Sequence, residues 1–181
     1  MAMTIRQAAP INGAAVLPDV LVAQQLRQDS DDDAALIGVY RATALQWVEK
    51  RARVSMQRRA WLARFDGFST TVRLPIGPVV SVATVTYDNP AASSVDGAGL
   101  WRLAGEVLSL AFSTQWPAII DPAGATIVEF VAGTVDATTE YPHLCAAALM
   151  LIQHLYDGGN LNTPPAAVTM LCDVDRVPVI G

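Results

Sequence analysis

The chain has 181 residues, of which 52% are hydrophobic and 16% charged, so a substantial core is expected and disorder is not. No apolar run reaches the roughly 18–20 residues of a membrane helix, and no charged N-terminal start leads into an apolar stretch, so neither a membrane span nor a secretion signal is expected. The net charge of −5 argues against a protein that coats nucleic acid by bulk attraction. Two cysteines are too few to stabilise a domain by disulfide cross-links, and they fit a reduced, intracellular setting. These figures favour a soluble single-domain protein and leave its function open.

Helical patterns stand at both ends of the chain. Pro18 suits a first helical position and predicts a short helix over about 18–28. The run Asp31 to Asp33 can cap a second helix, over about 32–53, and supply negative charge to its first turn. Pro142 starts a third, over about 142–157, which is apolar nearly all round and ends at Gly158. A last short helix is expected over about 164–172. The second helix should bury one face, formed by Leu36, Ile37, Tyr40, Ala44, Trp47 and Val48.

The region from about 56 to 132 reads as strands without helical patterns between them, which predicts an antiparallel sheet. Ala104-Gly105 looks like a tight hairpin turn, and Asn89–Gly99 has the composition of a loop. The expected strands are 58–65, 71–74, 79–87, 101–103, 106–110 and 126–131.

The predicted fold is therefore α+β, with an antiparallel sheet inserted between helices of one domain. Residues 1–16 are expected to form an N-terminal arm and residues 173–181 an extended tail. Helical segments should occupy 17–54 and 141–172, and the β insertion 55–133.

The positive charge is concentrated in one stretch. Six cations and no acid lie between Lys50 and Arg64, while the rest of the chain is acidic; we call these cations the basic band: Lys50, Arg51, Arg53, Arg58, Arg59 and Arg64. The band can meet an acidic partner surface or a second copy of the chain. Alternatively, it marks a solvated edge strand that arginines keep from unwanted pairing.

Motifs of catalysis and cofactor binding are not found. His143 and His154 are too far apart along one helix to share a metal, and a capping or surface role is expected for each. The acidic run Asp29–Asp33 lacks the glycine and the final glutamate of a calcium loop, and Gly97-Ala98-Gly99 lacks the third glycine of a dinucleotide loop. Two cysteines cannot build a zinc site, and core packing is expected for Cys145. We therefore expect no enzyme, no cofactor and no metal.

Several short stretches, taken in order over about 18–173, resemble a known family. They are Val22–Arg27, the helix Asp33–Glu49, Leu74–Val79, Ser81–Asp88, Trp116-Pro117, Val128–Gly133, and Tyr141-Pro142 with the helix to Tyr156. In order and spacing they are similar to the head–tail connectors (adaptor or head-completion proteins) of tailed bacteriophages, in the branch with a β insertion between helices. The chain departs from the pattern at Leu171–Arg176, where the family often has a Leu-Leu-x-x-Tyr-Arg-like run, and residues 1–16 match nothing in it.

The resemblance implies a structural virion protein. Such proteins form a ring, typically of twelve copies, beneath the portal of the DNA-filled head, and the ring continues the DNA channel toward the tail or stopper. The expected partners are further copies of the chain, the portal, and a stopper or tail-terminator protein, with DNA passing through without sequence-specific binding. The expected location is the neck of the virion, and the host cytoplasm during assembly. Another neck component, such as a stopper or tail-completion protein, is the alternative; a phage and a gene-transfer particle would look alike.

Candidate contact residues follow from assembly by head-to-tail contacts. Arg58, Arg59 and Arg64 are candidates for the subunit interface. The terminal residues could dock on the portal as an extended segment or form a frayed terminus: Asp175, Arg176, Val177, Pro178, Val179, Ile180 and Gly181. The loop Asn89–Gly99 could face a tail partner or be an idle surface loop. An acidic channel lining is a further hypothesis, which a basic band facing the lumen would contradict.

Overall fold

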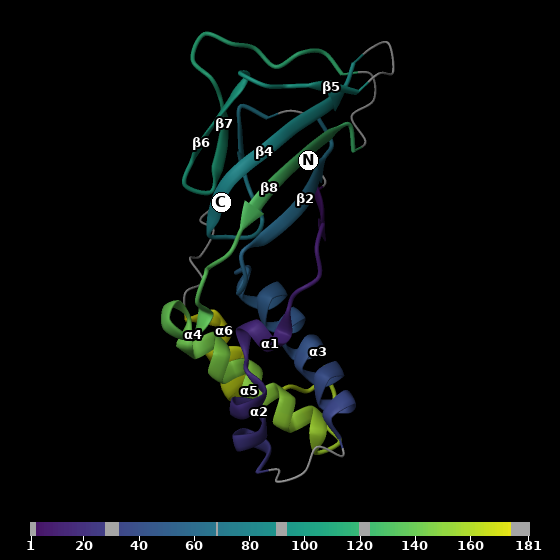
Figure 1. Cartoon of the computed structure of the whole chain (residues 1–181). Helices are drawn as coiled ribbons and strands as arrows, with labels where there is room; N and C mark the ends of the chain where they lie inside the picture. The colour runs from purple at the N-terminus through teal and green to yellow at the C-terminus, as the bar shows by residue number, and fades with distance from the viewer. Residues whose placement is uncertain (1–2, 28–32, 68, 90–93, 120–123, 175–181) are drawn as a thin grey trace. The chain divides into compact units, whose positions relative to one another are not determined.

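The computed structural model (Figure 1) describes residues 3–27, 33–67, 69–89, 94–119 and 124–174. The chain divides into two compact units. The first consists of Met1–Pro10 and Arg58–Gly133, and we call it the β unit. The second consists of Ile11–Gln57 and Thr134–Gly181, and we call it the helical unit. The larger part of the β unit, Arg58–Gly133, is thus inserted in sequence between the two halves of the helical unit, whereas Met1–Pro10 precedes them.

The β unit contains two antiparallel sheets. A five-stranded sheet has the order β1-β2-β8-β4-β5, and a three-stranded sheet has the order β3-β7-β6. Figure 1 shows β2, β8 and β4 running side by side. The strands are β1 (Met3–Gln7), β2 (Arg59–Phe65), β3 (Thr71–Arg73), β4 (Val79–Asp88), β5 (Ser94–Asp96), β6 (Trp101–Ala104), β7 (Val107–Leu110) and β8 (Thr126–Ala132).

Buried and more exposed residues alternate along the central strands, and the buried ones form the core of the β unit. Every second residue of β2 and of β8 is buried, among them Phe65 and Phe130. These side chains form one cluster with Leu74, which follows β3, and Leu108 of β7. The three-stranded sheet therefore covers one face of the five-stranded sheet, as in a β sandwich. We call the opposite face of the five-stranded sheet its outer face.

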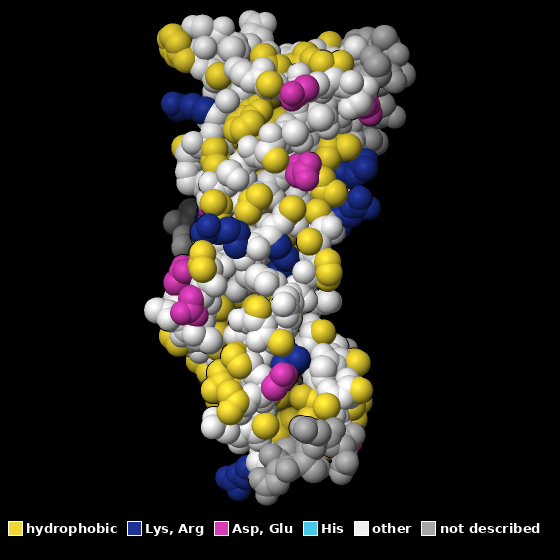
Figure 2. All heavy atoms as spheres, in the orientation of Figure 1, with side chains coloured by type: hydrophobic (Ala, Val, Ile, Leu, Met, Phe, Trp, Pro, Cys, Tyr) yellow, Lys and Arg dark blue, Asp and Glu magenta, His cyan; other side chains and the backbone are white. Residues whose placement is uncertain are grey.

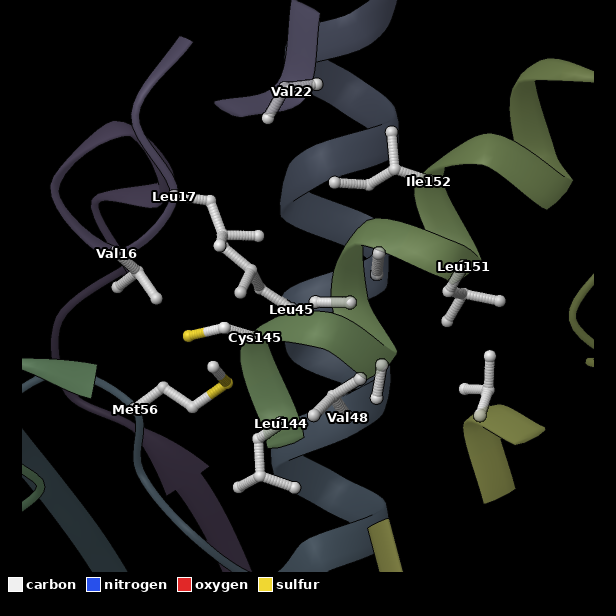
Figure 3. Close-up of a cluster of buried hydrophobic side chains, with 14 of the residues drawn as sticks. Val16, Leu17, Val22, Leu45, Val48, Met56, Leu144, Cys145, Leu151 and Ile152 are labelled. Atoms are coloured by element: carbon white, nitrogen blue, oxygen red, sulfur yellow. The ribbon is translucent and has the colours of Figure 1, made fainter. Parts of the chain in front are cut away.

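The helical unit packs its helices around one apolar cluster. Figure 3 shows α5 contributing Leu144, Cys145, Leu151 and Ile152, which lie against Leu45 and Val48 of α3. The helices are α1 (Gly13–Val16), α2 (Asp19–Leu26), α3 (Ala34–Ala52), α4 (Ala137–Glu140), α5 (Pro142–Tyr156) and α6 (Ala166–Asp173). No helix in the described residues is long and apolar enough to cross a membrane.

The predicted α+β class is confirmed, and so are most of the expected elements. The four expected helices correspond to α2, α3, α5 and α6, and the six expected strands to β2, β3, β4, β6, β7 and β8. As expected, Pro142 stands in the first turn of α5. Gly158 follows that helix with φ +85°, a left-handed conformation that glycine adopts without strain.

Several expectations need correction. Residues 1–16 contain β1 and α1, because β1 finds hydrogen-bond partners in β2, which is distant in sequence. The loop Asn89–Gly99 contains the strand β5, which pairs with β4. The strands form two sheets instead of one, and the short helix α4 was not foreseen.

The second helix also differs in detail. Asp33 stands at its N-cap position without a capping hydrogen bond from its side chain, and Oδ2 instead accepts from the Tyr156 hydroxyl at 2.8 Å. Asp31 and Asp32 lie outside the described residues. Leu36 is exposed, whereas Leu45 and the carboxylate of Glu49 are buried.

Candidate functional site

The two histidines serve local contacts in the helical unit. The His143 ring lies edge-on to that of Tyr141, with 6.2 Å between the centroids. His154 Nε2 lies 3.1 Å from the carbonyl oxygen of Asn160, just beyond the end of α5. Within the part of the chain that the structure describes, no group of three or more His, Cys, Asp or Glu side chains could hold a metal ion.

The two cysteines are free thiols inside the helical unit. Cys145 belongs to the core cluster (Figure 3), as expected, and so does Cys172. Burial raises the pKa of the Cys145 thiol to about 11, and the charge of Asp136 adds to the shift. Burial likewise raises the pKa of the Cys172 thiol to about 11, with a further contribution from Asp173. Neutral, buried thiols are poor nucleophiles and ligands.

The structure divides the basic band between the two units. Lys50 and Arg51 stand in the last turn of α3, where cations favour the helix dipole, and Arg53 follows with φ 59°. Arg51 is engaged within the chain, because its Nη2 donates to Asp173 Oδ2 at 2.7 Å. Arg58, Arg59 and Arg64 belong to the β unit instead. Each unit therefore carries three of the six cations.

The three interface candidates of the β unit differ in exposure. Arg59 is only 7% exposed, and its guanidinium lies 4.5 Å from the centroid of the Trp61 ring. Arg58 and Arg64 are exposed. Arg58 immediately precedes β2, and Arg64 belongs to it. The strand β2 lies between β1 and β8, so the interpretation of this stretch as an edge strand is wrong. Sequence could not reveal this, because the strand that covers β2 comes from the N-terminal residues.

The outer face of the five-stranded sheet carries four exposed charges, of which only Arg64 was a candidate from the sequence. Arg64 and Arg6 lie on this face toward β1, and Asp88 and Asp96 lie on it toward β5. All four side chains are exposed. In β1, the alternation of Met3 and Ile5 with polar residues was the available signal, though a short one. On the face of the β unit seen in Figure 2, the charged side chains of the described residues stand in separate small groups.

A single aromatic residue stands out at the surface. Phe112 is 96% exposed, in a turn where Thr114 Oγ1 donates to the carbonyl oxygen of Ala111 at 2.7 Å and Ser113 has φ 60°. Val135 and Met170 are also more than two-thirds exposed. Large exposed apolar side chains are typical of contact sites when they gather in patches. Phe112 belongs to the β unit, and Val135 and Met170 belong to the helical unit.

The C-terminal docking candidates, residues 175–181, lie outside the described residues. The last described residue is Val174, which is exposed and caps α6. The loop candidate is described in part, as Asn89 and 94–99.

The fold places the chain among α+β proteins in which most of an antiparallel β sandwich is inserted, in sequence, between the two parts of a helical unit. No family model matches the chain, and no curated protein sequence does. Solved structures do match, among them three that each align over 98% of this chain and 98% of the other. A chain from the neck of an empty gene transfer agent (GTA) particle, computed with C6 symmetry, has 22% identity and a TM-score of 0.79.

A chain from the neck of the native GTA particle, computed with C12 symmetry, has 22% identity and a TM-score of 0.77. A chain from the virion of the native particle has 21% identity and a TM-score of 0.75. These values show a shared fold over 98% of both chains. The expected likeness to a neck protein of a phage-like particle is thereby confirmed at the level of the fold.

Proposed function

We propose that this protein is a structural component of a virion neck, where it forms a ring beneath the portal and joins the DNA-filled head to the tail or stopper. The observation that carries the proposal is the likeness, over 98% of both chains, to chains from GTA necks. The order of sequence stretches that resembles head–tail connectors points the same way and does not depend on the structure. The role would be assembly, without catalysis or a cofactor.

A ring of copies is supported by the symmetry of the similar structures. The necks that contain the matched chains were computed with C6 and C12 symmetry, and a protein with one contact surface on each side closes into such a ring by head-to-tail contacts. Twelve copies are the number that the connector resemblance implies.

Passage of DNA through the ring fits the charge of the chain. A net charge of −5 gives little general attraction for phosphates, and a channel must let DNA slide without binding it tightly. Portal and stopper or tail-terminator proteins would be the partners above and below the ring. The chain would assemble in the host cytoplasm and remain in the virion neck.

The proposed contact residues are the three interface arginines, which differ in exposure, and the C-terminal residues. Arg58 and Arg64 are exposed in the β unit and can face an acidic neighbour. Arg59 is buried beside Trp61. It would therefore contribute to an interface indirectly, by stabilising the strand β2, and not by contacting the neighbouring copy. Residues 175–181 remain the candidate for docking on the portal.

A stopper or tail-completion protein is the second candidate. Stoppers are predominantly β, whereas the described residues of this chain include six helices, which favours the connector.

The deciding experiment is the mass of the purified full-length chain, alone and mixed with the portal from the same particle. A connector should give a complex with the mass of the portal plus about twelve copies. A monomer that ignores the portal would contradict the connector and favour the stopper or tail-completion role. In parallel, removal of the gene should leave DNA-filled heads without tails; normal tailed particles would contradict a neck role altogether.

A further inference from the structure

The two edges of the five-stranded sheet carry opposite charges on one face. The strand register aligns Thr4, Arg64, Ile127, Thr86 and Asp96 in one row across β1, β2, β8, β4 and β5. Residues that are directly opposite one another in a sheet point to the same side. Arg64, next to one edge, and Asp96, on the other edge, therefore both lie on the outer face.

Each edge holds a pair of like charges. Arg6 is opposite Leu62, one row from Arg64, so the two arginines are diagonal neighbours. Asp88 is opposite Ser94 and is likewise the diagonal neighbour of Asp96. Diagonal neighbours are about 7–8 Å apart. We call Arg6 with Arg64 the basic edge, and Asp88 with Asp96 the acidic edge.

The two pairs cannot neutralise each other within one chain. Three strand spacings separate β2 from β5, which is about 14 Å, well beyond ion-pair distance. Among the described residues, no ion pair involves any of the four side chains. Glu129 lies on the same face, diagonal to Arg64 and half-buried, and does not form an ion pair with it.

The edges are also open at the level of the main chain. β1 and β5 are the outermost strands of the sheet, so within the described residues each has a strand neighbour on one side only. An open strand edge offers N–H and C=O groups to another strand. On the face opposite Arg6, β1 also leaves Met3 and Ile5 exposed, by 44% and 37%. That combination of open hydrogen-bonding groups and uncovered apolar side chains is unfavourable for an isolated chain.

We propose that copies of this chain associate edge to edge, β1 of one copy beside β5 of the next, with the basic edge against the acidic edge. The inference rests on the proposed ring and names the surface that forms it. Like charges would repel in a β1–β1 or a β5–β5 contact, so only the head-to-tail arrangement is favoured. A contact between two different edges repeats from copy to copy, which is what a closed ring requires.

The apolar side of the edges agrees with this pairing. Met3 shares a cross-strand row, on the core-facing side, with Tyr87 and Val95 at the opposite edge. Joining β1 to β5 of the next copy would continue that side across the contact and cover Met3 and Ile5. The joined strands would add main-chain hydrogen bonds, as in other cases of strand addition.

Charge reversal tests the proposal with full-length chains. R6E/R64E makes both edges acidic, and D88R/D96R makes both basic. The quadruple variant R6E/R64E/D88R/D96R exchanges the two and is complementary again. Arg102→Glu is the matched control, since Arg102 is an exposed cation on β6 in the other sheet of the same unit. Circular dichroism checks that each variant is folded. The substitution of Asp96 removes the 3.0 Å hydrogen bond from Ala98 N to Asp96. If the double variant D88R/D96R unfolds for that reason, Asp88→Arg alone replaces it.

Self-association is measured by sedimentation at low salt. Each double variant should associate at least about tenfold more weakly than the wild type. The quadruple variant, and an equimolar mixture of the two doubles, should regain association, and R102E should be unchanged. Doubles that associate like the wild type, or folded swapped variants that regain nothing, would overturn the proposal. If the purified wild type is monomeric, incorporation of the same variants into particle necks is measured instead. The double variants should be incorporated less than the wild type, and the quadruple variant should regain incorporation. Equal incorporation of all variants would overturn the proposal.

The outcomes separate this inference from the proposed function. If the chain is present in necks but all variants incorporate equally, edge pairing fails and the neck role stands. If the wild-type chain is absent from necks but the reversal and its rescue act on self-association, the neck role fails and edge pairing stands.

Discussion

Arg51, in the last turn of α3, donates a hydrogen bond to Asp173 at the end of α6, with 2.7 Å between Nη2 and Oδ2. The two residues are 122 positions apart in sequence. The ion pair fastens the last described helix to the longest helix of the helical unit.

Removing this pair should have a small but measurable effect on stability. Both side chains are about 40% exposed, so solvent screens the attraction, and a coupling free energy of about 0.2–1 kcal/mol is expected. The measurement is a double-mutant cycle of Arg51→Ala and Asp173→Ala by urea unfolding at low salt. Lys50→Ala, an exposed neighbour in the same helical turn, is the control and should change stability little. A coupling of zero would show that the pair contributes nothing in solution.

Arg59 and Arg58 are adjacent cations with different surroundings, so their substitutions should differ. Arg59→Ala removes a buried side chain and its cation–π contact with Trp61, which should cost about 1–2 kcal/mol of unfolding free energy. Arg58→Ala changes an exposed side chain and should stay within about 0.5 kcal/mol. Denaturant titration of both variants provides the comparison. Equal effects would contradict the distinction between a structural arginine and a surface arginine.

The buried thiols should make stability fall in alkaline solution. Folding raises the pKa of Cys145 and Cys172 from 9.0 to about 11, chiefly through burial. Below pH 9 the folded and unfolded chains both hold these protons, so the thiols contribute no pH dependence there. Between about pH 9 and 11 the unfolded chain releases protons that the folded chain keeps, so the free energy of unfolding decreases as pH rises.

The check is denaturant unfolding across this range for the wild type and for C145A/C172A. Other groups titrate there too, so the informative quantity is the difference between the two slopes. The variant should lose less stability per pH unit than the wild type. Identical slopes, or rapid thiol alkylation of the folded wild type near neutral pH, would contradict the raised pKa values.

Deletion of residues 175–181 tests the tail as a portal-docking segment. The shortened chain ends at Val174 and keeps α6 complete, so its unfolding midpoint should stay at the wild-type value. Binding to the portal and head completion should decrease. A full-length variant with Val177, Val179 and Ile180 changed to Asp separates loss of apolar docking residues from loss of length. Unchanged particle assembly with either variant would rule the tail out.

Local pattern identified most elements because their signals lie within a few residues. The helix α5 follows from Pro142, an apolar run and Gly158, and β4 follows from its β-branched residues. The strand β5 has no such signal, because its short segment is held by pairing with β4. The surroundings of the individual arginines could not be predicted either, because Arg51, Arg59 and Arg64 look alike in sequence. In the structure Arg51 forms an ion pair, Arg59 is buried and Arg64 is exposed.

The sequence by itself determined the α+β class, the periodic helices and strands, and an order of segments that points to a neck protein. Only the tertiary structure decided that β1 joins the sheet beside β2 and that Arg64 and Asp96 share one row on one face. The physical reason is that helical and strand periods arise from neighbours along the chain. Register, burial of a particular cation and the charge of a sheet edge depend on strands that are far apart in sequence and meet only when the chain folds.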